Sequence, residues 1–114
     1  MKTILLPTDF SDNALKAVHY AIALYGDQDN RFVLFHGIHI PTGSSEVSYL
    51  PLAEMQKESD AYLSELAKTL EMKLAVGNSS LEILSASGVS TSNLIVRAAI
   101  DTEADLIIMG TQGA

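Results

Sequence analysis

Short hydrophobic runs alternate along the chain with longer segments in which hydrophobic residues recur every three or four positions. Continuous runs bounded by turn-forming residues are typical of strands that are buried on both faces of a sheet. Such runs occur at residues 4–6, 32–35, 81–84 and 105–109. In the third run hydrophobic and polar residues alternate only in part, so it is the weakest of the four strand predictions. In the fourth run the uninterrupted Leu106-Ile107-Ile108 predicts a buried strand.

Three amphipathic helices are predicted between these strands. The first begins at Ser11 or Asp12, either of which can cap a helix, and it ends at Gly26-Asp27. The second begins near Pro51 and ends at Gly77-Asn78. Its hydrophobic stripe consists of Leu52, Met55, Ser59, Tyr62, Leu63, Leu66 and Leu70. The third helix presents Leu94, Ile95, Ala98 and Ala99 on one face.

The alternation of strands and helices predicts an α/β fold with a doubly wound, Rossmann-like parallel sheet. Its order is β-α-β-α-β-α-β within a single domain at residues 1–114, because parallel strands need crossover connections. Residues 40–50, rich in Pro, Gly and Ser, predict a loop. Ligands of such sheets bind beyond the carboxyl ends of the strands, where the strand order reverses. This rule selects the loops at residues 7–11, 36–41 and 110–114.

Composition narrows the classes of function. The chain contains no cysteine, which excludes thiol catalysis, disulfides and zinc held by cysteine. A net charge of −7 argues against binding to nucleic acid or to an acidic membrane surface, but not against a small anion held by backbone N–H groups. Pro7 and Asp9 interrupt the first hydrophobic run too early for a signal peptide or a membrane span. We therefore expect a soluble cytoplasmic protein.

The most informative segment follows the fourth predicted strand. Gly110 and Gly113 stand three positions apart there, and glycine lets a backbone turn sharply and bring its N–H groups close to an anion. The Thr111 hydroxyl offers a further donor. This spacing predicts a phosphate-binding loop, although the same glycines also suit a plain turn between a strand and a helix.

Three segments of the sequence resemble the universal stress protein family, which has an adenine-nucleotide α-hydrolase-like fold. Residues 4–11 (ILLPTDFS) resemble the family's first strand and nucleotide loop, and residues 33–38 (VLFHGI) its second strand. Residues 104–114 (ADLIIMGTQGA) resemble its fourth strand and phosphate loop. The segments agree with the family in order and spacing, and the resemblance spans the whole chain.

This resemblance implies that the chain binds an adenine nucleotide, ATP with or without Mg²⁺, at the carboxyl ends of the strands. The residues implied in binding are Pro7, Thr8, Asp9, Gly37, Met109, Gly110, Thr111 and Gly113. The ATP-binding branch continues its motif, after a short spacer, with Gly-Ser or Gly-Thr, whereas this sequence stops at Ala114. We also expect the family's last helix and its fifth strand, which often pairs across a homodimer, to be lacking.

Two functions follow from this comparison. One is a regulatory module of the stress response that binds ATP with slow or no hydrolysis. The other is a dimerisation or interaction module of the same fold that binds no nucleotide. Without a fifth strand the fourth strand becomes a sheet edge, so we expect either self-association through residues 106–109, giving a homo-oligomer, or a further segment in the natural protein.

Several side chains have two interpretations. Asp9 accepts a hydrogen bond from adenine or ribose in the family reading, or forms an Asx turn or cap ahead of the first helix. Gly37 occupies a position that usually faces adenine, and it offers no side chain there.

Neither a metal site nor an active site is predicted. His36 and His39 point to opposite faces of an extended strand and so share no metal ion; His36 is expected to be structural and His19 to lie on the surface. No serine stands in a nucleophile elbow, and no base or arginine adjoins the glycine loop. We therefore expect no catalytic residue and at most weak ATP hydrolysis.

Overall fold

The computed structural model describes residues 1–40, 52–74 and 77–110. The elements follow in the order β1 (Thr3–Pro7), α1 (Asp12–Tyr25), β2 (Arg31–His39), α2 (Leu52–Leu74), β3 (Ser80–Gly88), α3 (Thr91–Thr102) and β4 (Leu106–Ile107). The strands form one parallel four-stranded sheet in the order β3-β2-β1-β4. The predicted α/β fold with a parallel sheet is confirmed. Most of the predicted loop at residues 40–50, and the predicted helix start at Pro51, lie outside the described residues.

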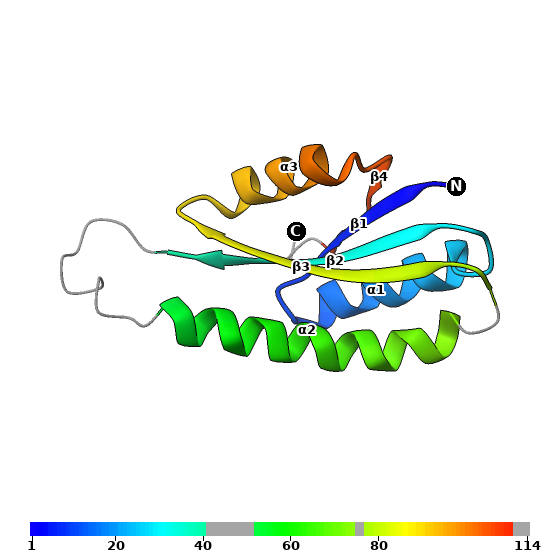
Figure 1. Cartoon of the computed structure of the whole chain (residues 1–114), viewed down its shortest axis with the longest axis horizontal. Coiled ribbons are helices and arrows are strands. Elements are labelled where there is room, and N and C mark those ends of the chain that lie inside the picture. Colours follow the sequence, from blue (N-terminus) through cyan, green and yellow to red (C-terminus); the bar gives the residue numbers. More distant parts are fainter. Residues whose placement is uncertain (41–51, 75–76, 111–114) are drawn as a thin grey trace.

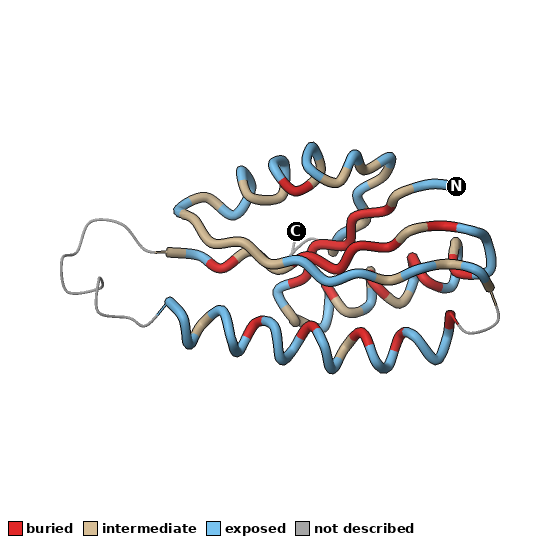
Figure 2. Tube along the Cα trace, in the orientation of Figure 1, coloured by how far each residue is buried: buried red, intermediate tan, exposed pale blue. Residues whose placement is uncertain are grey.

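Helices cover both faces of the sheet (Figure 1). Helices α1 and α2 pack on one face and α3 packs on the other. Because successive side chains of a strand point to opposite faces of the sheet, β1 and β2 contribute to a hydrophobic core on each face. Ile4, Leu6, Phe32 and Leu34 pack towards α1 and α2, and Leu5, Val33 and Phe35 pack towards α3. The predicted hydrophobic runs of the central strands, residues 4–6 and 32–35, are therefore buried, and Figure 2 shows them in red at the centre of the sheet.

The two outer strands differ from the prediction. None of the nine residues of β3 is fully buried, and the partial alternation of its sequence reflects this edge position. Strand β4 covers only Leu106–Ile107, and the Ile107 side chain is 46% exposed. The prediction of a buried strand at residues 105–109 is therefore wrong. Among the described residues β4 pairs only with β1, so its other side has no neighbouring strand.

Helix α1 begins where its predicted cap places it, and α3 is capped by a serine that was not predicted. Ser11 Oγ accepts a hydrogen bond from Ala14 N at 3.3 Å to cap α1, and Gly26 follows its last residue. At α3, Ser90 Oγ accepts from Asn93 N at 3.3 Å. Helix α2 is described as far as Leu74, and residues 75–76, which precede the predicted stop at Gly77-Asn78, lie outside the described residues. No helix in the described ranges is long and hydrophobic enough to cross a membrane.

The hydrophobic stripe of α2 is only partly as predicted. Its buried residues are Ser59, Leu63, Ala67, Leu70 and Leu74. Tyr62 is 55% exposed because it lies off the line that the buried positions follow along the helix. Leu52 lies on that line but is 40% exposed, as the first residue of α2. Small Ala67 occupies a core position that size and hydrophobicity alone do not reveal.

Replacement of Leu5 by alanine tests how strongly the fold depends on β1. Leu5 is fully buried and lies opposite Ile107 in the β1–β4 register. We expect Leu5→Ala to lower the free energy of unfolding by about 2–5 kcal/mol, because it leaves a cavity in a closed core. The matched variant Ile107→Ala should cost less than about 1 kcal/mol, since that side chain is half-exposed. Urea unfolding measures both, and equal losses would contradict this account.

Candidate functional site

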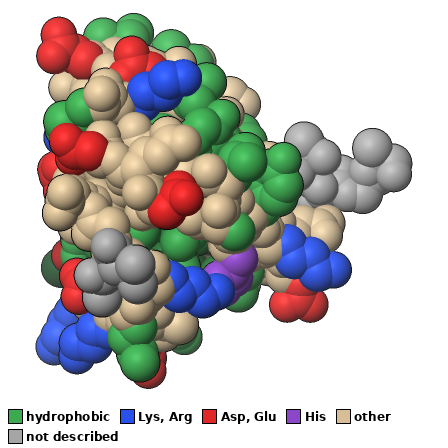
Figure 3. Space-filling view, turned by 90° about the vertical axis from the view of Figure 1, so that its right-hand side faces the viewer, with side chains coloured by type: hydrophobic (Ala, Val, Ile, Leu, Met, Phe, Trp, Pro, Cys, Tyr) green, Lys and Arg blue, Asp and Glu red, His purple; other side chains and the backbone are tan. Residues whose placement is uncertain are grey.

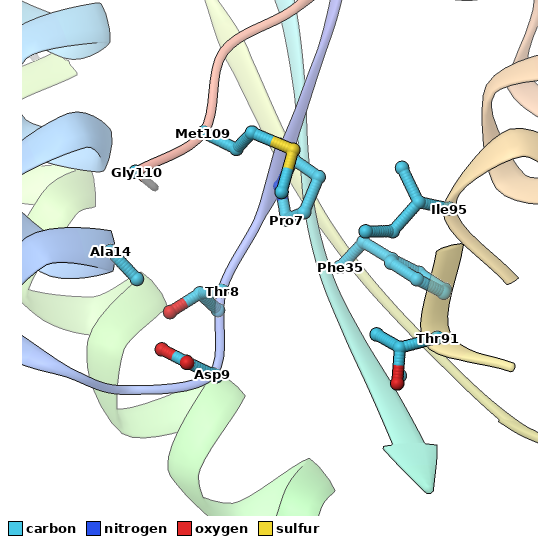
Figure 4. Close-up of a pocket in the computed structure, with 10 residues that line it drawn as sticks. Pro7, Thr8, Asp9, Ala14, Phe35, Thr91, Ile95, Met109 and Gly110 are labelled. Carbon is cyan, nitrogen blue, oxygen red and sulfur yellow. The ribbon is translucent and has the colours of Figure 1, made fainter. Parts of the chain in front are cut away.

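A cleft of about 120 Å³ opens at the carboxyl ends of the central strands. It is lined by Pro7, Thr8, Asp9, Ala14, Phe35, Gly37, Thr91, Ile95, Met109 and Gly110 (Figure 4). Strands β2 and β3 follow on one side of β1, and β4 is added on the other. The cleft therefore lies at the point where the strand order reverses, which is where open α/β sheets bind ligands.

The structure brings most of the predicted site residues together. Those that line the cleft are Pro7, Thr8, Asp9, Gly37, Met109 and Gly110. Thr111 and Gly113 lie outside the described residues. The ends of the three loops selected from the sequence thus meet in one place, with contributions from β1, β2 and the segment after β4.

Two side-chain bonds shape the turn that leads from β1 into α1. Thr8 Oγ1 accepts from Phe10 N at 3.0 Å, and Asp9 Oδ1 accepts from Ser11 N at 2.9 Å. Phe10 adopts a left-handed conformation with φ of 64°, which is unusual for a bulky residue. Asp9 therefore forms the predicted Asx turn and also lines the cleft, so its two interpretations coexist.

The Asp9 carboxyl is suited to accept hydrogen bonds from a ligand. Bonds from the Ser11 side chain and then from its backbone hold the pKa of Asp9 below its ordinary value. The group is therefore ionised at neutral pH, and an ionised carboxylate is acceptor-only. Asp9 is exposed, so a ligand can reach it.

An aromatic cluster ties this turn to α2. The ring centroid of Phe10 lies 4.8 Å from that of His36 and 5.3 Å from that of Tyr62. His36 Nδ1 lies 2.6 Å from the hydroxyl of Ser59, which is only 2% exposed. Burial lowers the pKa of His36, and the negative charge of Asp9 partly opposes that shift. His36 thus packs as a structural residue behind the cleft.

The two described glycines of the cleft differ in how much room the fold leaves for a side chain. A Cβ on Gly110 would lie 2.4 Å from the backbone oxygen of Asn13, so only glycine lets this loop approach the first turn of α1. At Gly37 a Cβ would lie 3.4 Å from Leu94 Cδ1 and 3.5 Å from Thr91 Cγ2. These are ordinary contacts, so the fold does not require glycine at position 37.

Sequence reasoning missed four residues of the cleft wall. They are Ala14 on α1, Phe35 on β2, and Thr91 and Ile95 on α3. Phe35 carried a usable signal, because it shares a strand face with Val33 and ends the hydrophobic run. The loop after β3, which ends at Thr91, also lies at a carboxyl end of the sheet and was not among the three selected loops.

A second hollow, of about 230 Å³, lies between the ends of α1 and α2. It adjoins the turns at Gly26 and Gly77, which precede β2 and β3, so it is at the opposite end of the sheet. Its Lys73 Nζ already donates to His19 Nδ1 at 2.9 Å. Figure 3 views this end of the molecule, where acidic and basic side chains are interspersed. This hollow lies away from the carboxyl ends of the strands, and its lysine is already hydrogen-bonded. Both facts favour the first cleft as the ligand site.

Metal ligands do not gather in the described part of the chain. Residues 1–40, 52–74 and 77–110 contain no group of three or more His, Asp or Glu side chains placed to hold a metal ion.

Acidification tests the environment of His36. Burial holds its pKa below the ordinary value of 6.5, so the unfolded chain takes up the proton first as the pH falls. We expect the free energy of unfolding to decrease between about pH 8 and about pH 5.5. The control His36→Gln should show a shallower decrease in urea titrations across this range. Equal slopes for the two proteins would contradict the assignment.

Comparison with known proteins places the chain in a family. The family model described as the universal stress protein family matches residues 1–114. No curated protein matches closely enough to count as a relative.

Solved structures of this family share the fold. A family protein from Burkholderia pseudomallei is 23% identical with a TM-score of 0.73, over 96% of this chain and 81% of that one. One from Arabidopsis thaliana with AMP bound is 12% identical with a TM-score of 0.70, over 99% and 78%. A universal stress protein in complex with cAMP is 22% identical with a TM-score of 0.63, over 95% and 75%. At these identities the likeness establishes the fold, while the family model covers the full sequence. The chain belongs to the universal stress protein family.

Proposed function

We propose that the cleft binds an adenine nucleotide and that the chain acts as a regulatory module with slow or no hydrolysis. The observation that carries this proposal is the meeting of Pro7, Asp9, Gly37 and Gly110 in one cleft at the reversal of strand order. The family membership supports it, as do the two structural neighbours that contain AMP and cAMP.

The shape and chemistry of the cleft suit a purine base. Pro7, Phe35, Ile95 and Met109 offer hydrophobic surfaces on either side of a slot, and Asp9 stands at its rim (Figure 4). Its volume of about 120 Å³ is below the roughly 300–1,000 Å³ of pockets that enclose drug-sized ligands. The base therefore occupies the cleft and the sugar and phosphates extend beyond it.

The phosphates are assigned to the loop that begins at Gly110. Its backbone approaches the first turn of α1, and the amino end of a helix favours negative charge. Thr111 and Gly113 follow directly in the sequence and complete the proposed loop. ATP is the proposed ligand, and any Mg²⁺ would arrive coordinated mainly by the phosphates.

The lining of the cleft favours binding over catalysis. Asp9 is the one ionisable side chain among its described lining residues, and that carboxylate is engaged in the turn. Phosphoryl transfer is accelerated by cationic groups around the phosphates and by a residue that positions water. The described wall offers neither an arginine nor a lysine, which supports slow or no hydrolysis.

Nucleotide binding is testable on the purified chain. We expect heat-released ligand, separated by chromatography, to include an adenine nucleotide, and calorimetry to detect ATP and AMP binding. Asp9→Asn keeps an acceptor for Ser11 N, so the turn persists, but it removes the charge. We expect about tenfold weaker binding, as for the loss of a hydrogen bond to a charged group.

The matched control is Asp29→Asn, an exposed carboxylate outside the cleft, which should bind like the unaltered chain. Absence of binding to any adenine nucleotide, at every Mg²⁺ concentration, would refute the proposed function.

A second function is favoured by the exposure of β4. Ile107 lies on an edge of the described sheet with 46% of its surface exposed. Edge strands present unpaired backbone groups to other chains. We propose, as the alternative, that two copies associate along this edge and that the chain serves as a dimerisation module.

A charge at position 107 separates the two functions. We expect the unaltered chain to scatter light as a dimer and Ile107→Lys to shift it towards the monomer, because the new ammonium would have to be desolvated at the shared edge. Nucleotide affinity should remain unchanged in this variant. A strictly monomeric unaltered chain at all concentrations would rule out association through β4.

A further inference from the structure

Thr91, the first residue of α3, stands across the cleft from Asp9 (Figure 4). It is not needed as a helix cap, because Ser90 Oγ accepts the hydrogen bond from Asn93 N. No hydrogen bond joins the Thr91 hydroxyl to another described residue. Thr91 is exposed and lines the cleft, so its side chain lies at the rim and is open to solvent.

Thr91 lies beside Gly37 on the neighbouring strand β2. A Cβ at position 37 would lie 3.5 Å from the Thr91 methyl group and 3.4 Å from Leu94 Cδ1. The first turn of α3 therefore packs directly over the Gly37 backbone, and the methyl group of Thr91 faces the strand. Beside Gly37, which has no side chain, Thr91 and Ile95 of α3 supply this part of the cleft wall.

The two polar groups at the rim differ in what they can bind. The Asp9 carboxylate only accepts hydrogen bonds, whereas a threonine hydroxyl both donates and accepts. Between them lies the hydrophobic slot formed by Pro7, Phe35 and Ile95. A flat ring in that slot would present one polar edge to Asp9 and the opposite edge to Thr91. The exocyclic amino group of adenine would suit Asp9, and a ring nitrogen at the far end of the base, such as N3, would suit the Thr91 hydroxyl.

We propose that Thr91 is a specificity-determining residue whose hydroxyl hydrogen-bonds to the base, opposite Asp9. The inference rests on the proposed function of the cleft and adds to it a contact from α3, outside the three loops that resemble the family. Thr91 contacts the base and not the phosphates, so its contribution is the same for ligands with and without phosphate.

Two variants separate the hydroxyl of Thr91 from its methyl group. Thr91→Val keeps the shape and removes the hydroxyl, and Thr91→Ser keeps the hydroxyl and removes the methyl group. Calorimetry on the full chain measures the affinity of each for adenosine, AMP and ATP, and thermal unfolding checks that both remain folded. We expect Thr91→Val to lower the affinity for all three ligands by the same factor, about 3- to 10-fold, because one neutral hydrogen bond is lost. Thr91→Ser should stay within about twofold of the unaltered chain.

Three results would overturn the inference. In the first, Thr91→Val binds the ligands with the affinity of the unaltered chain. In the second, Thr91→Ser loses as much affinity as Thr91→Val. In the third, Thr91→Val loses affinity for ATP but not for adenosine. In each case the unaltered chain still binds, so the proposed function stands and only the role of Thr91 falls. If the unaltered chain binds none of the three ligands, the proposed function itself fails, and the inference fails with it.

Discussion

The whole structure depends on the burial of β1 from Ile4 to Pro7. Ile4, Leu5 and Leu6 are fully buried, and the strand pairs with β2 on one side and β4 on the other. A strand enclosed on both faces and both sides has no room for a ligand or a solvated polar group. Polar chemistry therefore begins where the strand ends, at Thr8 and Asp9, and the cleft forms there because nothing deeper in the sheet can open.

The sequence predicted what local patterns determine. The buried strands β1 and β2 and the cap of α1 were recognisable, because hydrophobic runs and capping side chains act over a few residues. The burial of β4 was predicted wrongly, since a hydrophobic run does not reveal how many neighbours a strand has. Tyr62 was misplaced for a related reason: the orientation of α2 depends on the sheet beneath it.

The candidate site was predictable to a similar extent. Topology alone indicated that the loops after β1, β2 and β4 face one another, and the residues at their bases do meet. No local motif indicated that Thr91 and Ile95 complete the wall, because α3 reaches the cleft by crossing the opposite face of the sheet. The reason for glycine at position 110 is likewise tertiary, since it lies in the backbone of α1 rather than in the loop's own turn.

The contrast between the two glycines has an evolutionary consequence. At position 110 the backbone of α1 leaves no room for a side chain. At position 37 a Cβ would meet only side-chain atoms, at ordinary contact distances. The cleft thus has one invariable boundary and one that a single codon change can narrow at little cost to stability. A lineage carrying this fold could therefore alter which molecules its cleft admits through position 37, while the boundary at Gly110 stays fixed.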